Sequence, residues 1–161
     1  MINEIDLMHL RRCVELAEGA LDAGDEPFGS ILVAGNGSVL MEDRNRVAGG
    51  DHTQHPEFAI ARWAANHLTP EQRREATVYT SGEHCPMCAA AHGWVELGRI
   101  VYASSSAQLA EWLGEWGAPE PKVRTLRIQE VIRNTEVEGP APELAAQVKE
   151  LHRRMRSAPQ P

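Results

Sequence analysis

The sequence has little cysteine, with Cys13, Cys85 and Cys88 as its three thiols in 161 residues. Three cysteines cannot form a disulfide framework, and a close pair in a reducing compartment is typical of metal binding or redox chemistry. Cys13 lies among apolar residues at helical spacing, so we expect it to be a small buried thiol.

Long hydrophobic runs are also missing. The longest, such as residues 31–34, fall far short of the roughly 20 apolar residues that a membrane span needs. Residues 1–6 are acidic, whereas a secretory signal begins basic and continues apolar. We therefore expect a cytoplasmic protein that does not cross a membrane.

Positive charge is scarce, with 16 Lys and Arg against 23 Asp and Glu and a net charge of −7. A negative surface repels phosphate backbones, so the composition disfavours a nucleic-acid partner. A local basic cluster at Arg153, Arg154 and Arg156 leaves that partner open. The length fits one domain with one core, which we place at residues 1–157, followed by a disordered tail at 158–161.

Hydrophobic periodicity predicts an alternation of helices and strands. Residues 6–23 have the pattern of an amphipathic helix, and strands at 31–33 and 39–41 are joined by an Asn36-Gly37 turn. Further helices are predicted at 55–68, 86–97 and 107–113, with a helical turn from Pro70, strands at 77–80, 100–103 and 127–133, and a last helix after a break at 139–142.

A helix lies between the last two predicted strands, which favours a parallel pair, because parallel neighbours need a long crossover. The predicted fold class is therefore α/β. We expect a three-layer α/β/α arrangement in which a five-stranded mixed sheet lies between helices.

Two short clusters carry the chemistry. His55-Pro56-Glu57 and Cys85-Pro86-Met87-Cys88 match the patterns H-x-E and C-x-x-C, and each opens a predicted helix with proline in its first turn. His55, Cys85 and Cys88 provide three zinc ligands, and three protein ligands leave the open position that is typical of catalytic zinc. Glu57 is close enough to move protons there without being a ligand.

Two other interpretations of the cysteine pair remain. A C-x-x-C motif containing proline is also typical of thioredoxin-like redox proteins. A structural zinc site would need a fourth ligand, for which His52, His84 and His92 are available. The upstream H-x-E favours catalytic zinc over both.

These motifs resemble the zinc-dependent cytidine-deaminase-like superfamily, whose signature is H-x-E followed by P-C-x-x-C. The chain is most similar to the guanine deaminase and tRNA adenosine deaminase branch, over residues 8–133. The matching segments are 27–33, 45–46, 51–55, 79–83 and 85–94. The resemblance implies the same fold, a Zn²⁺ cofactor and a homodimer. Pro56 and His84 depart from it, since the family usually has a small residue and a proline there.

The resemblance implies a hydrolytic deaminase, and we expect its substrate to be a small nucleobase such as guanine, a related aminopurine or an aminotriazine. The alternatives are adenosine in tRNA, cytosine or a nucleoside. Glu57 is the expected proton carrier. Glu115 falls near an acidic residue that helps guanine deaminases move a second proton, and Glu111 competes for that role.

Four more residues are candidates for holding a planar base. Asn45 matches the family position that hydrogen-bonds the base, although a residue of this type also suits a turn. Phe28, Trp94 and Trp112 are predicted to form aromatic walls around the base, and Trp116 is a further candidate. Core packing is the other interpretation of each aromatic residue.

Overall fold

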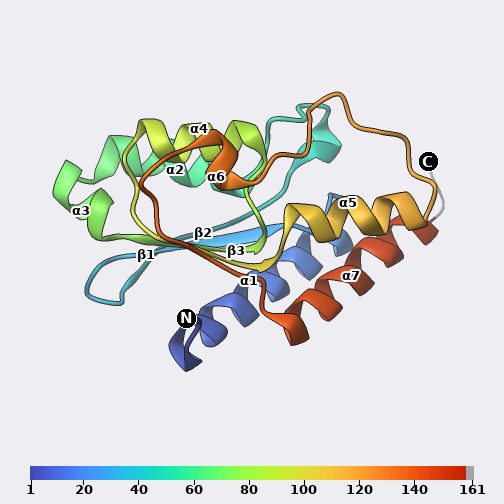
Figure 1. Cartoon of the computed structure of the whole chain (residues 1–161), viewed down its shortest axis with the longest axis horizontal. Helices are drawn as coiled ribbons and strands as arrows, with labels where there is room; N and C mark the ends of the chain where they lie inside the picture. Colours follow the sequence, from blue (N-terminus) through green and yellow to red (C-terminus); the bar gives the residue numbers. More distant parts are fainter. Residues whose placement is uncertain (159–161) are drawn as a thin grey trace.

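The computed structural model describes residues 1–158 of the chain. These residues form a five-stranded sheet with helices on both faces (Figure 1). The strand order is β2-β1-β3-β4-β5, with β1 at Gly29–Val33, β2 at Val39–Arg44, β3 at Thr77–Gly82, β4 at Ile100–Ser104 and β5 at Val137–Glu138. Because β1 is antiparallel to β2 and β3, while β3, β4 and β5 are parallel, the predicted three-layer mixed fold is confirmed.

The predicted hairpin is formed by β1 and β2. Gly37 in its turn has a φ of +89°, a conformation that glycine adopts without strain. The N–H of Ser38 donates to Oδ1 of Asn36 at 3.0 Å and closes the turn. All of β1 is buried, whereas β2 is partly exposed, so β1 lies inside the sheet and β2 at its edge.

Two groups of helices cover the sheet (Figure 1). On one face lie α1 (Glu4–Asp22), α5 (Ser106–Glu115) and α7 (Pro142–Ser157), and on the other α2 (Pro56–His67), α3 (Pro70–Glu75), α4 (Pro86–Trp94) and α6 (Ile128–Val131). The predicted helices are confirmed. Helix α4 ends at Trp94 and not at the predicted residue 97, and Glu96 beyond its end has a positive φ of 56°. Within residues 1–158, no helix has both the length and the apolar character to cross a bilayer. Of the predicted tail, residues 159–161 lie outside the described residues.

The strand predicted at residues 127–133 is wrong. The structure places helix α6 there, and the fifth strand is the two-residue β5, in which Val137 pairs with Ile100 of β4. The three apolar residues of this segment, Ile128, Val131 and Ile132, are all β-branched, which favours a strand, but their spacing of three and four residues is that of a helix. The predicted parallel pairing of the last two strands is nevertheless confirmed for β4 and β5.

Contacts from distant parts of the chain make this segment helical. The N–H of Ile128, the first residue of α6, donates to the Glu83 carboxyl group at 2.9 Å, across 45 positions of the sequence. On α4, Gly93 leaves room for the Ile132 side chain, because a β-carbon at that glycine would lie 2.7 Å from it. A prediction from the local sequence pattern cannot include either contact.

Asp6 ties α1 to the sheet. Its carboxylate accepts hydrogen bonds from the Tyr79 hydroxyl at 2.8 Å and from the Arg99 guanidinium at 2.7 and 2.9 Å. The N–H of Asn3 also donates to it, at 3.0 Å, within the capping box of α1. Asp6 is 1% exposed, and the hydrogen bonds from Arg99 lower its pKa to about 2. A charged side chain thus helps to hold the first helix in place.

We expect Asp6→Asn to lower the free energy of unfolding by about 2 to 3 kcal/mol at pH 7, because it removes the buried carboxylate that accepts from Arg99 and Tyr79. The folded-state pKa of Asp6 is about 2 against an ordinary value of 3.8. This stabilisation is therefore complete above about pH 4 and is lost as the pH falls toward about 2. Urea unfolding at a series of pH values should show the difference from wild type narrowing over that range.

Glu4→Gln is the control, since Glu4 is an exposed carboxylate in the same first turn of α1. Its effect should stay within about 0.5 kcal/mol. If the free energy of unfolding of Asp6→Asn differs from that of wild type by the same amount at neutral pH and at about pH 3, the ionised Asp6 carboxylate is not the source of the stabilisation.

Candidate metal centre and active site

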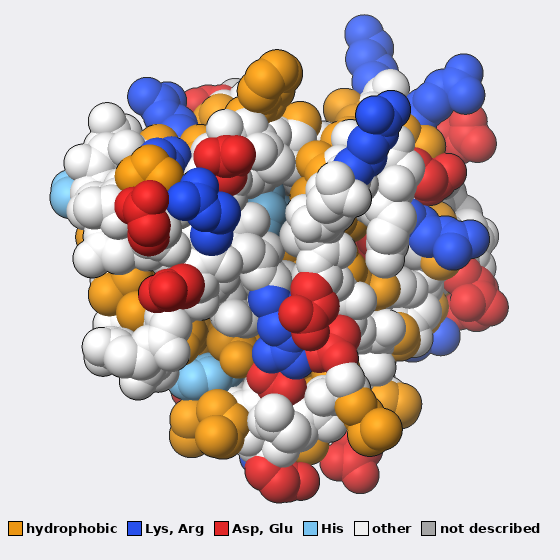
Figure 2. Space-filling model, turned by 60° about the vertical axis from the view of Figure 1, so that its left-hand side comes forward, with side chains coloured by type: hydrophobic (Ala, Val, Ile, Leu, Met, Phe, Trp, Pro, Cys, Tyr) orange, Lys and Arg blue, Asp and Glu red, His pale blue; other side chains and the backbone are white. Residues whose placement is uncertain are grey.

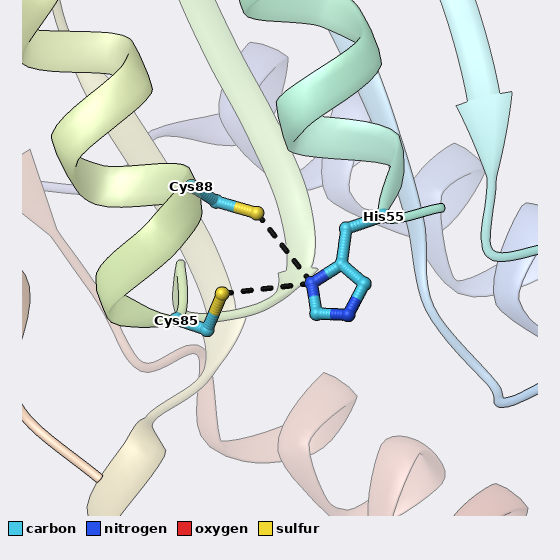
Figure 3. A group of neighbouring side chains, drawn as sticks. All are labelled: His55, Cys85 and Cys88. Carbon is cyan, nitrogen blue, oxygen red and sulfur yellow. Dashed lines mark hydrogen bonds between the residues drawn. The ribbon is translucent and has the colours of Figure 1, made fainter. Parts of the chain in front are cut away.

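The predicted ligands lie where α2 and α4 begin. His55 precedes α2 and Cys85 precedes α4, each with an extended backbone, and Pro56 and Pro86 occupy the first helical positions. Cys88 lies one turn into α4. Because the two helices pack against each other, the three side chains point toward one another (Figure 3).

The distances among these side chains fit zinc. Nδ1 of His55 is 3.5 Å from each of the Sγ atoms of Cys85 and Cys88, and all three atoms lie within 4.8 Å of one another. With Zn–N near 2.0–2.1 Å and Zn–S near 2.3 Å, tetrahedral zinc holds nitrogen and sulfur ligands roughly 3.6 Å apart. One imidazole and two thiols are also a donor set that zinc prefers. The residues present therefore fit a zinc ion with one coordination position left over.

Interactions within this cluster favour a thiolate at Cys85. Hydrogen bonding to Cys88, and then to His55, lowers the pKa of Cys85 to about 4. The pKa of Cys88 is raised, because its thiol donates to Cys85 and is buried. Hydrogen bonding to Cys85 raises the pKa of His55. Thiolates are the form of cysteine that binds metals.

Glu57 lies in the first turn of α2 and is 5% exposed. Its Oε1 accepts hydrogen bonds from the Thr80 hydroxyl at 2.6 Å and the Ser30 hydroxyl at 3.1 Å. None of the described side chains donates a hydrogen bond to its Oε2. Burial raises the pKa of Glu57 above its ordinary value, against the hydrogen bond from Thr80. One oxygen is thus held in place, and the other is available for a proton.

A cavity of about 190 Å³ adjoins this cluster and is lined in part by His55, Glu57 and Cys85. Leu109 of α5 contributes to its side. Its outer wall is residues 121–126, from the coil between α5 and α6. Pockets for drug-sized ligands span roughly 300–1,000 Å³. This cavity therefore has the size for a small ligand.

Phe28 is the predicted aromatic residue that lines the cavity. Its ring packs edge-on against His152 of α7, with centroids 5.0 Å apart. The backbone N–H of Asn45 donates a hydrogen bond to the backbone carbonyl of Phe28 at 3.0 Å. The Asn45 side chain is 1% exposed, and its Oδ1 accepts from the N–H of Val47 while Nδ2 has no partner. One end of this amide stabilises a turn, and the other end is uncommitted.

The structure does not bring the predicted tryptophans to the cavity. Trp94, at the end of α4, is 87% exposed. Trp112 is buried in the core that α1, α5 and α7 form on the sheet, and Trp116 packs against the same core. Trp112 and Trp116 therefore pack in the core, as the alternative interpretation of the aromatic residues expects.

Glu115 and Glu111 are exposed residues of α5. The carboxylate of Glu115 accepts a hydrogen bond from Nζ of Lys149 at 3.0 Å. Neither glutamate lines the cavity. The structure therefore separates both from the metal-binding cluster.

The structural-zinc interpretation requires a fourth protein ligand. His84 adjoins Cys85, but its buried ring packs edge-on against His92, with centroids 5.4 Å apart. In the part of the chain that the structure describes, the metal-binding group contains neither of these residues nor His52. This composition favours the open, catalytic type of site.

Sequence reasoning missed Ser30, Thr80 and Glu83. Ser30 and Thr80 are polar residues in buried strands, and Glu83 is a glutamate that is 9% exposed and lines the cavity. Buried polar groups are nearly always hydrogen-bonded, so polar residues inside apolar strand patterns were the available signal. Nothing in the sequence marked residues 121–126 as a cavity wall.

Residues 3–104 match the family described as the cytidine and deoxycytidylate deaminase zinc-binding region. The match contains His55, Cys85, Cys88 and Glu57, and it ends with β4. Residues 121–126 lie beyond it. The metal-binding cluster thus has a counterpart in the family, whereas the outer wall of the cavity is outside the matched region.

Three relatives illustrate the range of similar proteins. A probable cytosine deaminase of Schizosaccharomyces pombe is 35% identical over 122 residues, 74% of this chain and 73% of that protein. A tRNA-specific adenosine deaminase of Haemophilus influenzae is 30% identical over 104 residues, 64% of this chain and 60% of that protein. The X-ray structure of guanine deaminase from Bacillus subtilis aligns with a TM-score of 0.58 and 29% identity, covering 78% of this chain and 83% of that chain.

We expect one tightly bound zinc ion per chain, because three ligand atoms already converge at zinc-binding distances. Elemental analysis of protein purified without added metal measures it. Cys85→Ser and His55→Ala should each lose most of the zinc. Cys13→Ala is the matched control, since Cys13 is buried in α1 outside the cluster, and it should keep the metal. Protein without zinc, or with a Cys85–Cys88 disulfide, would contradict this and favour the redox interpretation.

Proposed function

The chain belongs to the zinc-binding cytidine and deoxycytidylate deaminase family, and on that premise we propose that it deaminates a small free nucleobase. Guanine, a related aminopurine or an aminotriazine is the substrate we favour. The observation that carries the proposal is Glu57, which lines a small cavity beside three zinc-ligating side chains and has one oxygen uncommitted.

In the proposed reaction, water adds to the ring carbon that carries the amine, and the carbon–nitrogen bond to that amine breaks. One proton of the water goes to the adjacent ring nitrogen and the other to the amine, which leaves as ammonia. His55, Cys85 and Cys88 would hold the zinc ion. When bound, zinc supplies Lewis-acid chemistry that polarises water and lowers its pKa.

Glu57 moves both protons in this proposal. Thr80 and Ser30 fix its Oε1 by hydrogen bonds, so Oε2 takes and returns protons without a change of rotamer. The cavity has one other carboxyl side chain, Glu83, and both of its oxygens accept hydrogen bonds from backbone N–H groups. Since Glu115 is paired with Lys149, we assign the second proton transfer to Glu57 as well.

Phe28 and Asn45 are the residues we propose to hold the base. Phe28 offers an apolar ring surface to a planar ligand. The buried Nδ2 of Asn45 lacks a partner, and an unpartnered buried donor costs free energy that a ring carbonyl or ring nitrogen would offset. Asn45 does not itself line the cavity, but its N–H is bonded to Phe28, which does. Trp94 at the end of α4 and Trp112 in the core have no such link to the cavity, so neither is part of this proposal.

Charge supports a free base over tRNA. Two members of the basic cluster on α7, Arg153 and Arg154, each pair with a carboxylate, at 2.6 and 3.0 Å, and Lys149 of the same helix pairs with Glu115 at 3.0 Å. Figure 2 shows basic and acidic side chains interspersed over one face of the molecule. A tRNA enzyme must neutralise several phosphates around its pocket.

Cytosine is the second candidate substrate. The Schizosaccharomyces pombe relative, named a probable cytosine deaminase, supports it. A cavity of about 190 Å³ also suits a single six-membered ring. Glu57 and Asn45 would have the same roles toward cytosine.

Ammonia release across a substrate panel tests the proposal. The panel is guanine, 2,6-diaminopurine, aminotriazines, cytosine, cytidine, deoxycytidine monophosphate and tRNA; the nucleotide is included because the cationic Arg124 lines the outer wall. We expect free bases to react fastest, with little dependence on salt. Faster deamination of tRNA, with rates that fall steeply as salt rises, would overturn the free-base assignment.

Glu57→Gln should retain zinc and fold but lose about 10²- to 10⁴-fold in kcat, because an amide of nearly the same shape cannot carry protons. Kinetics on the best substrate of the panel and elemental analysis measure both properties. Glu71→Gln, on the exposed surface of α3, is the control and should be unchanged. A Glu57→Gln enzyme with a near-normal rate would remove Glu57 from its role.

We also expect a homodimer, as the resemblance to the family implies, and we place Trp94, which is 87% exposed at the end of α4, in its interface. Light scattering at micromolar concentration should give twice the chain mass, and Trp94→Glu should shift it toward the monomer. Met8→Glu, at an exposed apolar residue of α1, is the control. A wild-type monomer would refute the prediction.

A further inference from the structure

The outer wall of the cavity has little support of its own. Residues 118–127 form no helix or strand, and within residues 1–158 no hydrogen bond involves residues 119–126. One side of residues 121–126 faces the cavity. A second hollow, of about 800 Å³, lies between the same residues and the end of α5. The wall therefore separates two spaces instead of packing on a core.

Such a segment is positioned by the helices before and after it, and the first residues of both helices are bonded to one side chain. Oε2 of Glu83 accepts from the N–H of Ser106, the first residue of α5, at 2.7 Å. Oε1 accepts from the N–H of Ile128, the first residue of α6, at 2.9 Å. The N–H groups of a first helical turn have no partner within their helix, so Glu83 satisfies one from each.

The backbone of Glu83 is itself fixed. Its N–H donates to the carbonyl of Ser104, at the end of β4, at 2.8 Å. Glu83 also lies two residues before Cys85, in the turn that carries β3 into α4. The same short turn thus presents a metal ligand and holds the segment that closes the cavity.

We propose that Glu83 is a positioning residue that sets the width of the substrate cavity by tying the start of α5 to the start of α6, the helices that precede and follow the wall formed by residues 118–127. It acts through the wall and transfers no proton. This inference rests on the proposed function for its kinetic consequence, but the bonds themselves exist whatever the substrate is.

Glu83→Gln is the test, because an amide keeps the size of the side chain but has one acceptor oxygen instead of two. One backbone N–H would then face an NH₂ group, and the first turn of α5 or of α6 would lose its bond to residue 83. On the best substrate of the panel, we expect KM to rise about tenfold while kcat changes by less than about threefold, since the wall contributes to binding in ground and transition state alike. Zinc content should be unchanged.

Hydrogen exchange measured by mass spectrometry gives a readout that does not need a substrate. In wild type, the N–H groups of Ser106 and Ile128 should be protected, whereas residues 122–125 should exchange fast. In Glu83→Gln, exchange should rise in peptides that contain residues 106 and 128 and should not rise in α1 or α2. A uniform rise over the chain would mean a general loss of stability and would overturn the positioning role.

Glu130→Gln is the matched control. Glu130 accepts a hydrogen bond from the N–H of Arg127 at 2.8 Å, so it caps α6 locally and does not reach α5. Glutamine serves equally well in a capping box, and we expect wild-type KM and exchange. If Glu83→Gln does not fold, Glu83→Asp replaces it, because aspartate keeps both oxygens on a shorter side chain. The exchange rates of residues 106 and 128 in wild type then still test whether Glu83 protects these N–H groups.

The outcomes separate the two proposals. If wild type releases no ammonia from any member of the panel, the proposed function is wrong. The hydrogen-exchange measurement still tests the positioning role of Glu83 in that case. If wild type is active but Glu83→Gln has normal KM and normal exchange at residues 106 and 128, the positioning role is wrong and the proposed function stands.

Discussion

The packing of α2 against α4, with the two helices beginning side by side, is the constraint on which the site depends. His55 and Cys85 are the last extended residues before these helices, and a proline follows each. Successive residues of a helix differ by about 100° around its axis, so starting either helix one residue later would turn a ligand away from the cluster. The two prolines favour the observed starts, because proline suits the first position of a helix and not its interior.

The register of the sheet determines how the Glu57 side chain is oriented. Ser30 of β1 and Thr80 of β3 are directly paired across the antiparallel ladder, and both hydroxyl groups reach the same carboxyl oxygen. Since neighbouring residues of a strand face opposite sides, a slip by one residue would remove both bonds. The hydroxyl pair thus couples the pairing of two strands to the orientation of one side chain.

The sequence was sufficient for those parts of the protein that local chemistry determines. The hairpin follows from Asn36-Gly37, the helix starts from Pro56 and Pro86, and the metal-binding cluster from two motifs. Contacts between distant segments determine what the sequence did not reveal. The segment at 127–133 is helical because Glu83 bonds its first N–H, and α5 turns Trp112 into the core although its sequence suits a cavity wall as well. Residues 121–126 form a wall through their position between two anchored helices.

The two edges of the sheet limit how copies of this chain can associate. An edge strand presents unpaired backbone groups that recruit strands of other molecules, and charged side chains or short length prevent this. The edge strand β2 ends in Glu42, Asp43 and Arg44, and β5 at the opposite edge has two residues before Gly139 and Pro140. Neither edge is a good template for a continuous intermolecular sheet. A high local concentration of this protein should therefore favour contacts between helical surfaces over edge-to-edge aggregation.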